Sequence, residues 1–366
     1  MLVTIILLVV IFTALVLVHE WGHFITARRA GVAVDEFGVG FPPRLVGRRH
    51  GGTLYSVNAI PLGGFVRLRG EDGEDTSPES FMTASKGTRT RILLAGVTMN
   101  LIAGFVLLTI LCWLGLPALG GFAPGWLPKH YSQSPRLAIT EVVANSPAQA
   151  IGLHSGDFVL KANGQTVTDE SLLHFTKAHA GNTVSLSVVE NGQVVTRRVK
   201  LRPPGTTSGY LGIATQSVSK IGYNWWQGPV AAAWITLKLF ILTIWAIIGL
   251  IIHLPQLIGG LFTRGVPAAA GSAAGPVGIY FILQNLSRLG WPYIILFAAN
   301  ISVALAAFNV LPIPALDGGR LALIWIQELG GKRMKSQTEA IIHLVGFAAV
   351  IGLAIIITVY DVRRFL

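Results

Sequence analysis

Charged side chains are scarce in this chain. Asp, Glu, Lys and Arg make up 12% of its 366 residues and hydrophobic residues 52%, whereas a soluble domain carries about 25% charged residues. The mean hydropathy is +0.61. These values exclude an ordinary soluble protein. The length leaves room for several membrane spans and one soluble domain of usual size.

Cysteine is almost absent as well. The single cysteine, Cys112, excludes an intramolecular disulfide, so cysteine usage does not reveal the redox compartment. The formal net charge is +11, yet the sequence contains no zinc finger, helix-turn-helix or arginine-rich tract. Basic residues that flank membrane spans face anionic lipid headgroups. We therefore expect membrane lipid as a partner and no nucleic acid.

The first 18 residues contain no charged side chain, and the basic segment that begins a signal peptide is missing. Cleavage after this run would also destroy the motif that follows it. We therefore predict a retained membrane span over residues 2–27. Arg28 and Arg29 come directly after it, and the positive-inside rule then places the N-terminus outside and the end of the span near the cytosolic side.

An H-E-x-x-H motif, formed by His19, Glu20 and His23, lies at the end of this span. An ionisable residue costs roughly 2.5–3.5 kcal/mol at the centre of a membrane helix, so three of them together indicate a functional site. Residues i and i+4 share one face of a helix, which allows His19 and His23 to bind one zinc ion. Glu20 would act as general base toward water. The motif predicts a zinc peptidase that works inside a bilayer.

A catalytic zinc needs three protein ligands and an open position for water. The candidates for the third ligand within apolar sequence are Asp317, His253 and His343. We favour Asp317 because Pro312 and Pro314 break the helix before it, and irregular backbone at membrane depth must be buried or line a cavity. The alternative is an aspartate that caps the following helix. We expect His253 at an interfacial helix end and His343 as a packed or hydrogen-bonded histidine.

Glycine and polar residues dominate residues 31–90, between the first two predicted spans. Their pattern predicts short strands separated by glycine turns and followed by an acidic loop. The predicted elements are strands at 53–57 and 65–69, turns at 51–52 and 63–64, an acidic loop at 71–79 and a second span at 92–116. Asn100 is the only strongly polar side chain in that second span.

Charge returns in residues 126–220, where short apolar runs alternate with turns. Asn-Gly pairs at 163–164 and 191–192 are strong hairpin signals. We predict one soluble domain of mixed α/β type, a small barrel with helices, on the outer face because it follows the second span. The predicted strands are 138–143, 157–161, 183–190 and 193–201, and the predicted helices are 148–151 and 172–180.

The C-terminal part is again apolar. The run 229–254 either spans the membrane or lies along its surface, anchored at the interface by Trp225, Trp226 and Trp234. We favour a surface or re-entrant element, because Asp317 then reaches the depth of His19. The remaining predicted elements are a broken apolar segment at 291–325, a basic inner loop at Lys332, Arg333 and Lys335, and a last span at 340–360.

The expected fold is a polytopic α-helical membrane protein with about four transmembrane helices, a membrane-associated β-hairpin region and one inserted α/β domain. The predicted domains are an N-terminal membrane core over 1–125, the inserted domain over 126–220 and a C-terminal membrane core over 221–366.

Several motifs resemble those of the site-2 proteases, which are intramembrane zinc metalloproteases. They are HEWGH at 19–23, AGVTMN at 95–100, a soluble insert, and NVLPIPALDGG at 309–319. The resemblance covers nearly the whole chain and implies one Zn²⁺ per chain on His19, His23 and Asp317, with Glu20 as general base. It also implies that Asn309 binds the substrate backbone. Asn100, on the asparagine of the second core helix, is a further predicted substrate-binding residue.

Two positions depart from the family pattern. Ala304 stands where members often carry a second asparagine, and Val97 stands where proline is usual. Neither position is a ligand. Ala304 alters the usual substrate clamp, either through drift at a tolerant position or through a changed substrate preference.

The soluble domain resembles a PDZ domain. Residues 146–164 match the pattern SPAxxAGLxxGDxIxxxNG, with Ile151 where alanine is usual. The loop Gly209, Tyr210, Leu211 and Gly212 resembles the carboxylate-binding loop of such domains, which captures a peptide C-terminus as an added strand. An ordinary hairpin is the alternative. Other members carry two such domains in tandem, whereas this chain has room for one.

The strands at 53–69 resemble the membrane re-entrant β-hairpin region of the family. A helix cannot be cut while its backbone is internally hydrogen-bonded, because water must reach the scissile carbonyl. We therefore expect the substrate to extend along a strand at 64–69, in contact with Gly64 and Phe65.

The resemblance implies hydrolysis within transmembrane segments of single-span proteins, such as anti-sigma factors or remnant signal peptides, in a bacterial inner membrane. Two other classes stay open. A catalytically silent PDZ-bearing scaffold is disfavoured by the intact set His19, Glu20, His23 and Asp317. A metal transporter is disfavoured because the other spans offer almost no polar residues beyond Asn100 and His343.

Overall fold

The computed structural model describes all residues except 72–74, 76, 118–121, 133–135, 191–192, 206–208, 263–273, 331–333, 335 and 366. The described chain divides into two compact units. One unit comprises Met1–Leu108, Ala233–Leu283 and Phe297–Leu366; the other comprises Thr109–Ala232 and Gln284–Leu296. Each unit is built from residues far apart in the sequence. The predicted turn at 191–192 and the basic loop at Lys332, Arg333 and Lys335 lie outside the described residues.

Among the described residues, five helices are long and apolar enough to cross a membrane. They are α1 (Leu2–Arg29), α2 (Lys86–Leu114), α5 (Gln227–Ile252), α8 (Trp291–Val310) and α10 (Ser336–Phe365). The chain is a membrane protein, and its five candidate spans are consistent with a polytopic fold. The expectation of about four crossings differs by α5, and a surface or re-entrant placement of α5 remains a prediction.

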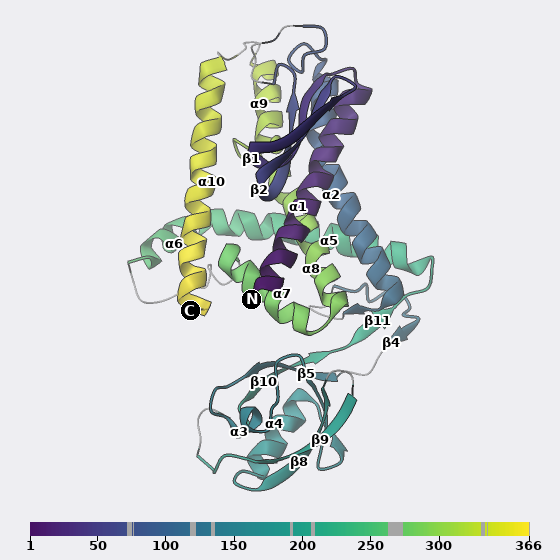
Figure 1. Cartoon of the computed structure of the whole chain (residues 1–366), viewed down its shortest axis with the longest axis vertical. Coiled ribbons are helices and arrows are strands. Elements are labelled where there is room, and N and C mark those ends of the chain that lie inside the picture. Colours follow the sequence, from purple (N-terminus) through teal and green to yellow (C-terminus); the bar gives the residue numbers. More distant parts are fainter. Residues whose placement is uncertain are drawn as a thin grey trace. The chain divides into compact units, whose positions relative to one another are not determined.

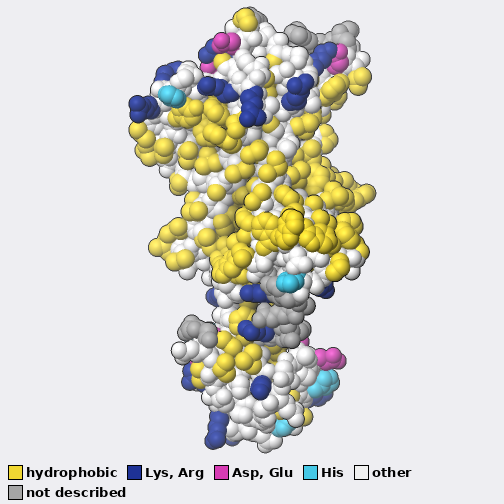
Figure 2. All heavy atoms as spheres, turned by 90° about the vertical axis from the view of Figure 1, so that its right-hand side faces the viewer, with side chains coloured by type: hydrophobic (Ala, Val, Ile, Leu, Met, Phe, Trp, Pro, Cys, Tyr) yellow, Lys and Arg dark blue, Asp and Glu magenta, His cyan; other side chains and the backbone are white. Residues whose placement is uncertain are grey.

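The surface has the composition that a bilayer requires. Large hydrophobic side chains on these helices are exposed, among them Trp245 at 66% and Phe347 at 57%. Figure 2 shows such side chains covering a broad area of one face, with Lys and Arg side chains gathered near its upper end. Apolar patches of this extent are not tolerated on a soluble monomer.

A twisted sheet follows α1 (Figure 1). It consists of β1 (Val34–His50) and β2 (Thr53–Leu68), joined by a turn at Gly51 and Gly52, whose φ angles are 56° and 86°. The first arm of β1 pairs on both sides, because Val39 lies opposite Val57 and also opposite Gly64. Residues 60–68 of β2, here called the edge arm, therefore form one outer edge of the sheet. The predicted turn at 63–64 is wrong, since β2 continues through it.

The sheet and α1 share a hydrophobic core. Phe24 and Ala27 of α1 pack with Val34 and Leu68 of the sheet and with Ile92 of α2. Apolar residues one helical turn apart in α1 thus meet the face of the sheet. This packing places the edge arm beside the C-terminal half of α1 (Figure 1).

Three shorter helices lie between the long ones in the sequence. They are α6 (Leu254–Gly260), α7 (Pro276–Arg288) and α9 (Asp317–Leu329). The end of α10 holds two of them. The hydroxyl of Tyr360 donates to the carbonyl of Leu257, 2.6 Å away, and the Gly278 N–H donates to the Asp361 carboxylate at 2.7 Å. These bonds satisfy backbone groups that helix ends leave unpaired.

The second unit contains the soluble domain. Its sheet has the order β10-β5-β6-β8-β9, with β7 beside β6, and its core includes Leu137, Ile139, Leu186 and Val188. The strands are β5 (Arg136–Val142), β6 (Phe158–Ala162), β7 (Gln165–Thr166), β8 (Thr183–Glu190), β9 (Gln193–Lys200) and β10 (Ile213–Val218), and the helices are α3 (Pro147–Ala150) and α4 (Asp169–Ala178). The predicted strands and helices are confirmed to within a few residues. The predicted barrel is wrong, because the described strands form an open path from β10 to β9.

Local signals explain the two helices of this domain. Ser146 caps α3 by accepting the N–H of Gln149 at 3.2 Å, and Thr168 and Ser171 form a capping box at the start of α4. A small sheet of β3 (Leu116–Pro117), β11 (Lys220–Gly222) and β4 (Tyr131–Ser132) joins the ends of the insert.

Candidate metal centre

Three side chains from two distant segments meet in the membrane unit. His19 and His23 lie one turn apart on the same face of α1, and Asp317 is the first residue of α9. The Oδ2 atom of Asp317 lies 3.0 Å from Nε2 of His19 and 3.3 Å from Nε2 of His23. The two Nε2 atoms are 3.1 Å apart. Both histidines are buried, at 7% exposure each.

The other ring nitrogens are held by α2. Nδ1 of His23 lies 2.8 Å from the carbonyl oxygen of Ile92 and donates to it, because a carbonyl can only accept. That tautomer leaves Nε2 of His23 with a free lone pair. Nδ1 of His19 faces the fully buried amide of Asn100 at 3.3 Å. The amide atom at this distance is the nitrogen Nδ2, whereas Oδ1 of Asn100 is buried and has no partner among the described residues. Turning the amide by 180° would bring Oδ1 to the Nδ1–H of His19 and fix the same tautomer as in His23.

These residues fit a divalent metal ion. Oδ2 of Asp317 is buried and has no hydrogen-bond donor within the described part of the chain. With both rings protonated at Nδ1, two imidazole lone pairs and one carboxylate oxygen converge here, and a bound cation would neutralise their mutual repulsion. A tetrahedral zinc with ligand bonds of about 2.0 Å separates its ligand atoms by about 3.3 Å, which the three observed distances approach.

Glu20 lies next to this cluster without joining it. Its Oε2 accepts the N–H of Val66 in the edge arm at 3.1 Å, and it is not among the three residues whose ligand atoms converge. The sheet thus holds the Glu20 carboxyl group beside the candidate metal ligands. This is the position that a general base requires.

The segment between α8 and α9 explains how Asp317 reaches the histidines. Pro312 and Pro314 follow the end of α8, where a proline cannot continue the helix. Ala315 has a φ of 81°, and its N–H donates to Nδ1 of His343 at 2.9 Å. Asp317 does not cap α9, which has no side-chain cap bond at its start. His343 is therefore a hydrogen-bonded residue that supports the turn, as predicted.

His253 has a separate location. It is exposed at the junction of α5 and α6, as the N-cap residue of α6. It is not part of the metal cluster. The expectation of a helix-end histidine is confirmed, and Asp317 is the candidate that meets the two histidines of the motif.

Sequence reasoning missed Gly96. A methyl group at this position of α2 would lie 2.7 Å from Nε2 of His19 and 2.6 Å from its Cε1, with Nε2 of His23 closer still. Only glycine therefore lets the Nε2 atoms of both histidines lie this close to α2. The signal was the glycine in the AGVTMN segment at 95–100, but its role depends on how α2 packs on α1.

The sequence model described as peptidase family M50 matches residues 7–353. The chain belongs to this family. Family M50 is the site-2 protease family, and this member of it is a zinc metallopeptidase of the site-2 protease type.

Alignments with similar proteins cover nearly the whole length of this M50 peptidase. A Clostridium perfringens protein is 31% identical over 96% of both chains. Zinc metalloprotease RasP of Geobacillus kaustophilus is 26% identical over 99% of this chain and 98% of its own. A Listeria innocua PDZ domain matches 22% of this chain and 92% of its own, with 21% identity and a TM-score of 0.19. A match of that size does not decide the fold of the insert.

The other predicted site residues of the M50 peptidase are spread over both units. Gly64 and Phe65 lie in the edge arm, and Phe65 stacks on Phe41 with ring centroids 6.3 Å apart. Asn309 lies in the last turn of α8. Gly209, Tyr210, Leu211 and Gly212 lie in the second unit, directly before β10. For Asn100, the observed contact is with His19, and its predicted contact with substrate remains a prediction.

Proposed function

We propose that this peptidase hydrolyses peptide bonds within the transmembrane segments of single-span membrane proteins. One Zn²⁺ would be held by His19, His23 and Asp317, and Glu20 would serve as general base. The observation that carries the proposal is the convergence of the ligand atoms of His19, His23 and Asp317 next to Glu20, where α9 meets a helix with the composition of a membrane span.

The protein groups have distinct tasks in this reaction. Zinc, when bound, supplies Lewis acidity that polarises the scissile carbonyl and makes water acidic. Glu20 takes the proton from the attacking water and gives it to the leaving amine. The carbonyl of Ile92 keeps His23 in the tautomer that leaves Nε2 free, and Asn100, with its amide oxygen turned toward the ring, would do the same for His19. We assign Asn309, on the helix that leads to Asp317, to contact with the substrate backbone.

A substrate helix must unwind before cleavage, and the edge arm would receive the extended chain. Its outward donor at Val66 already reaches the site, because it bonds Glu20 at 3.1 Å. A peptide added to this edge would exchange backbone hydrogen bonds with it, as in β-strand addition. Gly64 and Phe65 precede this donor, which accounts for their assignment to substrate binding.

Replacing Val66 by proline tests strand addition. Val66→Pro removes the outward N–H without removing a bond to β1, since this N–H faces Glu20. We expect cleavage to be lost while bound zinc stays near one per chain. Val66→Ala, which shortens the side chain and retains the N–H, should cleave nearly as well as the wild type. Equal cleavage by both variants would contradict strand addition at this residue.

The expected location is a bacterial inner membrane, with the metal centre near the cytosolic side. Arg28 and Arg29, which end α1, support that orientation. The soluble domain would then lie on the outer face. Its loop Gly209–Gly212 precedes β10, which is an edge strand with β5 as its neighbour. We assign this loop to capture of a peptide C-terminus.

Cleavage by the purified full chain tests the proposed function. A model single-span substrate in detergent should be cut within its hydrophobic segment, near the cytosolic end, by protein containing about one zinc per chain. Treatment with a chelator should stop cleavage, and added Zn²⁺ should restore it. Stoichiometric zinc without cleavage would favour a silent scaffold, and the absence of zinc would contradict the proposed function.

A further inference from the structure

The edge arm presents two outward N–H groups near the metal centre. Val66 donates to Oε2 of Glu20 at 3.1 Å, and Leu68 donates to Oε2 of Glu71 at 3.2 Å. Residues two apart in a strand point to the same side, so these two donors belong to one edge. Carboxylate side chains, and not a neighbouring strand, accept both of them.

The two carboxylates differ in what holds them. Glu20 belongs to α1 and lies at the metal centre, whereas Glu71 belongs to the turn that ends β2. The Glu71 N–H donates to the carbonyl of Leu68 at 3.2 Å, so Glu71 caps the strand with both its backbone and its side chain. A peptide added along the edge arm would meet Glu71 directly after the donor of Val66.

Glu71 is also bound to the helix that carries Asp317. Its second carboxylate oxygen, Oε1, forms an ion pair with the guanidinium of Arg320. Arg320 lies in the first turn of α9, three residues after Asp317. The Glu71 side chain is only 18% exposed, which strengthens a charge-assisted hydrogen bond relative to one in water. The end of the edge arm is therefore tied to the first turn of α9, which carries Asp317.

We propose that Glu71, anchored by Arg320, sets the register in which the substrate pairs with the edge arm. This inference rests on the proposed function. The substrate would take the donor of Val66 from Glu20, whereas Glu71, held by Arg320, keeps the donor of Leu68. Pairing therefore ends at Val66, which determines the substrate bond that lies at the metal centre. The side-chain period of a strand is two residues. Opening the donor of Leu68 therefore allows a second register, displaced by two residues.

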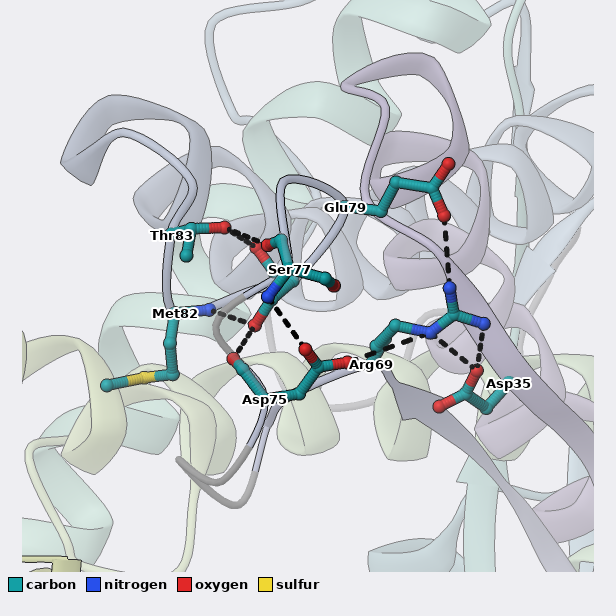
Figure 3. Close-up of polar contacts among 8 residues, drawn as sticks. Asp35, Arg69, Asp75, Ser77, Glu79, Met82 and Thr83 are labelled. Atoms are coloured by element: carbon teal, nitrogen blue, oxygen red, sulfur yellow. Dashed lines mark hydrogen bonds and ion pairs between the residues drawn. The ribbon is translucent and has the colours of Figure 1, made fainter.

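The rest of the turn is held by other contacts, which provide a matched control. Arg69 contacts Asp35 at 2.9 Å and Glu79 at 3.0 Å, as Figure 3 shows. Ser77 donates its N–H to Asp75 at 2.7 Å, and this bond lowers the pKa of Asp75. Glu79 is thus a glutamate of the same segment that leaves both outward donors of the edge arm untouched.

Mass spectrometry of the cleavage fragments tests the register. The full-length wild type, Glu71→Ala, Arg320→Ala and Glu79→Ala are compared on one single-span substrate in detergent, with zinc counted in each. We expect one cleavage position for the wild type and for Glu79→Ala. Glu71→Ala should add a second position two residues away. Arg320→Ala should add the same position in smaller amount, because Glu71 then keeps its bond to Leu68.

The outcomes separate this inference from the proposed function. Cleavage by the wild type supports the function regardless of the variants. An unchanged single position in Glu71→Ala, or complete loss of its cleavage with zinc retained, would overturn the register role. Should Glu71→Ala fail to hold zinc, Arg320→Ala decides, and an unchanged position in that variant would also overturn it.

Discussion

Glu20→Gln is expected to bind zinc like the wild type and to lose cleavage. Glutamine keeps the shape of the side chain, and its amide oxygen can still accept the N–H of Val66 that Glu20 accepts at 3.1 Å. It cannot take a proton from water. Because general acid–base catalysis contributes about 10²- to 10⁴-fold, kcat should fall by about that factor. His19, His23 and Asp317 are unchanged, so zinc should remain near one per chain.

The measurement combines metal analysis with single-turnover cleavage of a single-span substrate. Glu36→Gln is a suitable control, because Glu36 is another buried glutamate of the same unit and accepts the Ser56 hydroxyl at 2.7 Å. It should cleave at close to the wild-type rate. A Glu20→Gln protein that retains zinc and wild-type kcat would show that another group is the base.

Gly96→Ala is expected to expel the metal while leaving the helices folded. The added methyl group would lie 2.7 Å from Nε2 of His19, on the side of the ring that faces the other ligands. The backbone of α2 cannot move away easily, because Ile92 of this helix contacts His23 and Asn100 contacts His19. Since loss of a supporting contact alone weakens metal binding about 10- to 100-fold, we expect at least that loss here.

Gly87→Ala makes the same change on the same helix in open space. The nearest atom to an added methyl group at Gly87 is a nitrogen of Arg91 at 4.0 Å. Alanine favours a helix over glycine by about 1 kcal/mol, so neither variant should unfold α2. Zinc per chain and thermal unfolding are measured for both. Full zinc occupancy in Gly96→Ala would contradict the close packing of α2 on the metal ligands.

Much of the candidate site could be predicted from ionisable residues whose placement in a bilayer costs free energy. Ionisable side chains within apolar runs are rare because the bilayer penalises them, so His19, Glu20 and His23 were evident without a structure. Asp317 was evident as a lone acid behind two prolines. The spacing of four residues also determined that both histidines share one face of α1, which the Nε2 separation of 3.1 Å confirms.

Other features had no local signal. The prediction of a turn at 63–64 failed because glycine pairs suggest turns, whereas the edge arm continues through them to pair with the first arm of β1. The barrel prediction failed for a related reason. Strand patterns indicate which residues are extended, but they do not determine which strands close a sheet.

By itself, the sequence determined the membrane class and singled out His19, Glu20, His23 and Asp317 as the candidate ligands and base. Periodicity and the cost of charge in lipid act over a few residues, so they can be read directly along the chain. Only the tertiary structure decided that Val66 bonds Glu20, that Gly96 makes room at His19 and that Arg320 holds Glu71. Each of these contacts joins residues far apart in the sequence, and it exists only because packing brings α1, α2, α9 and the edge arm together.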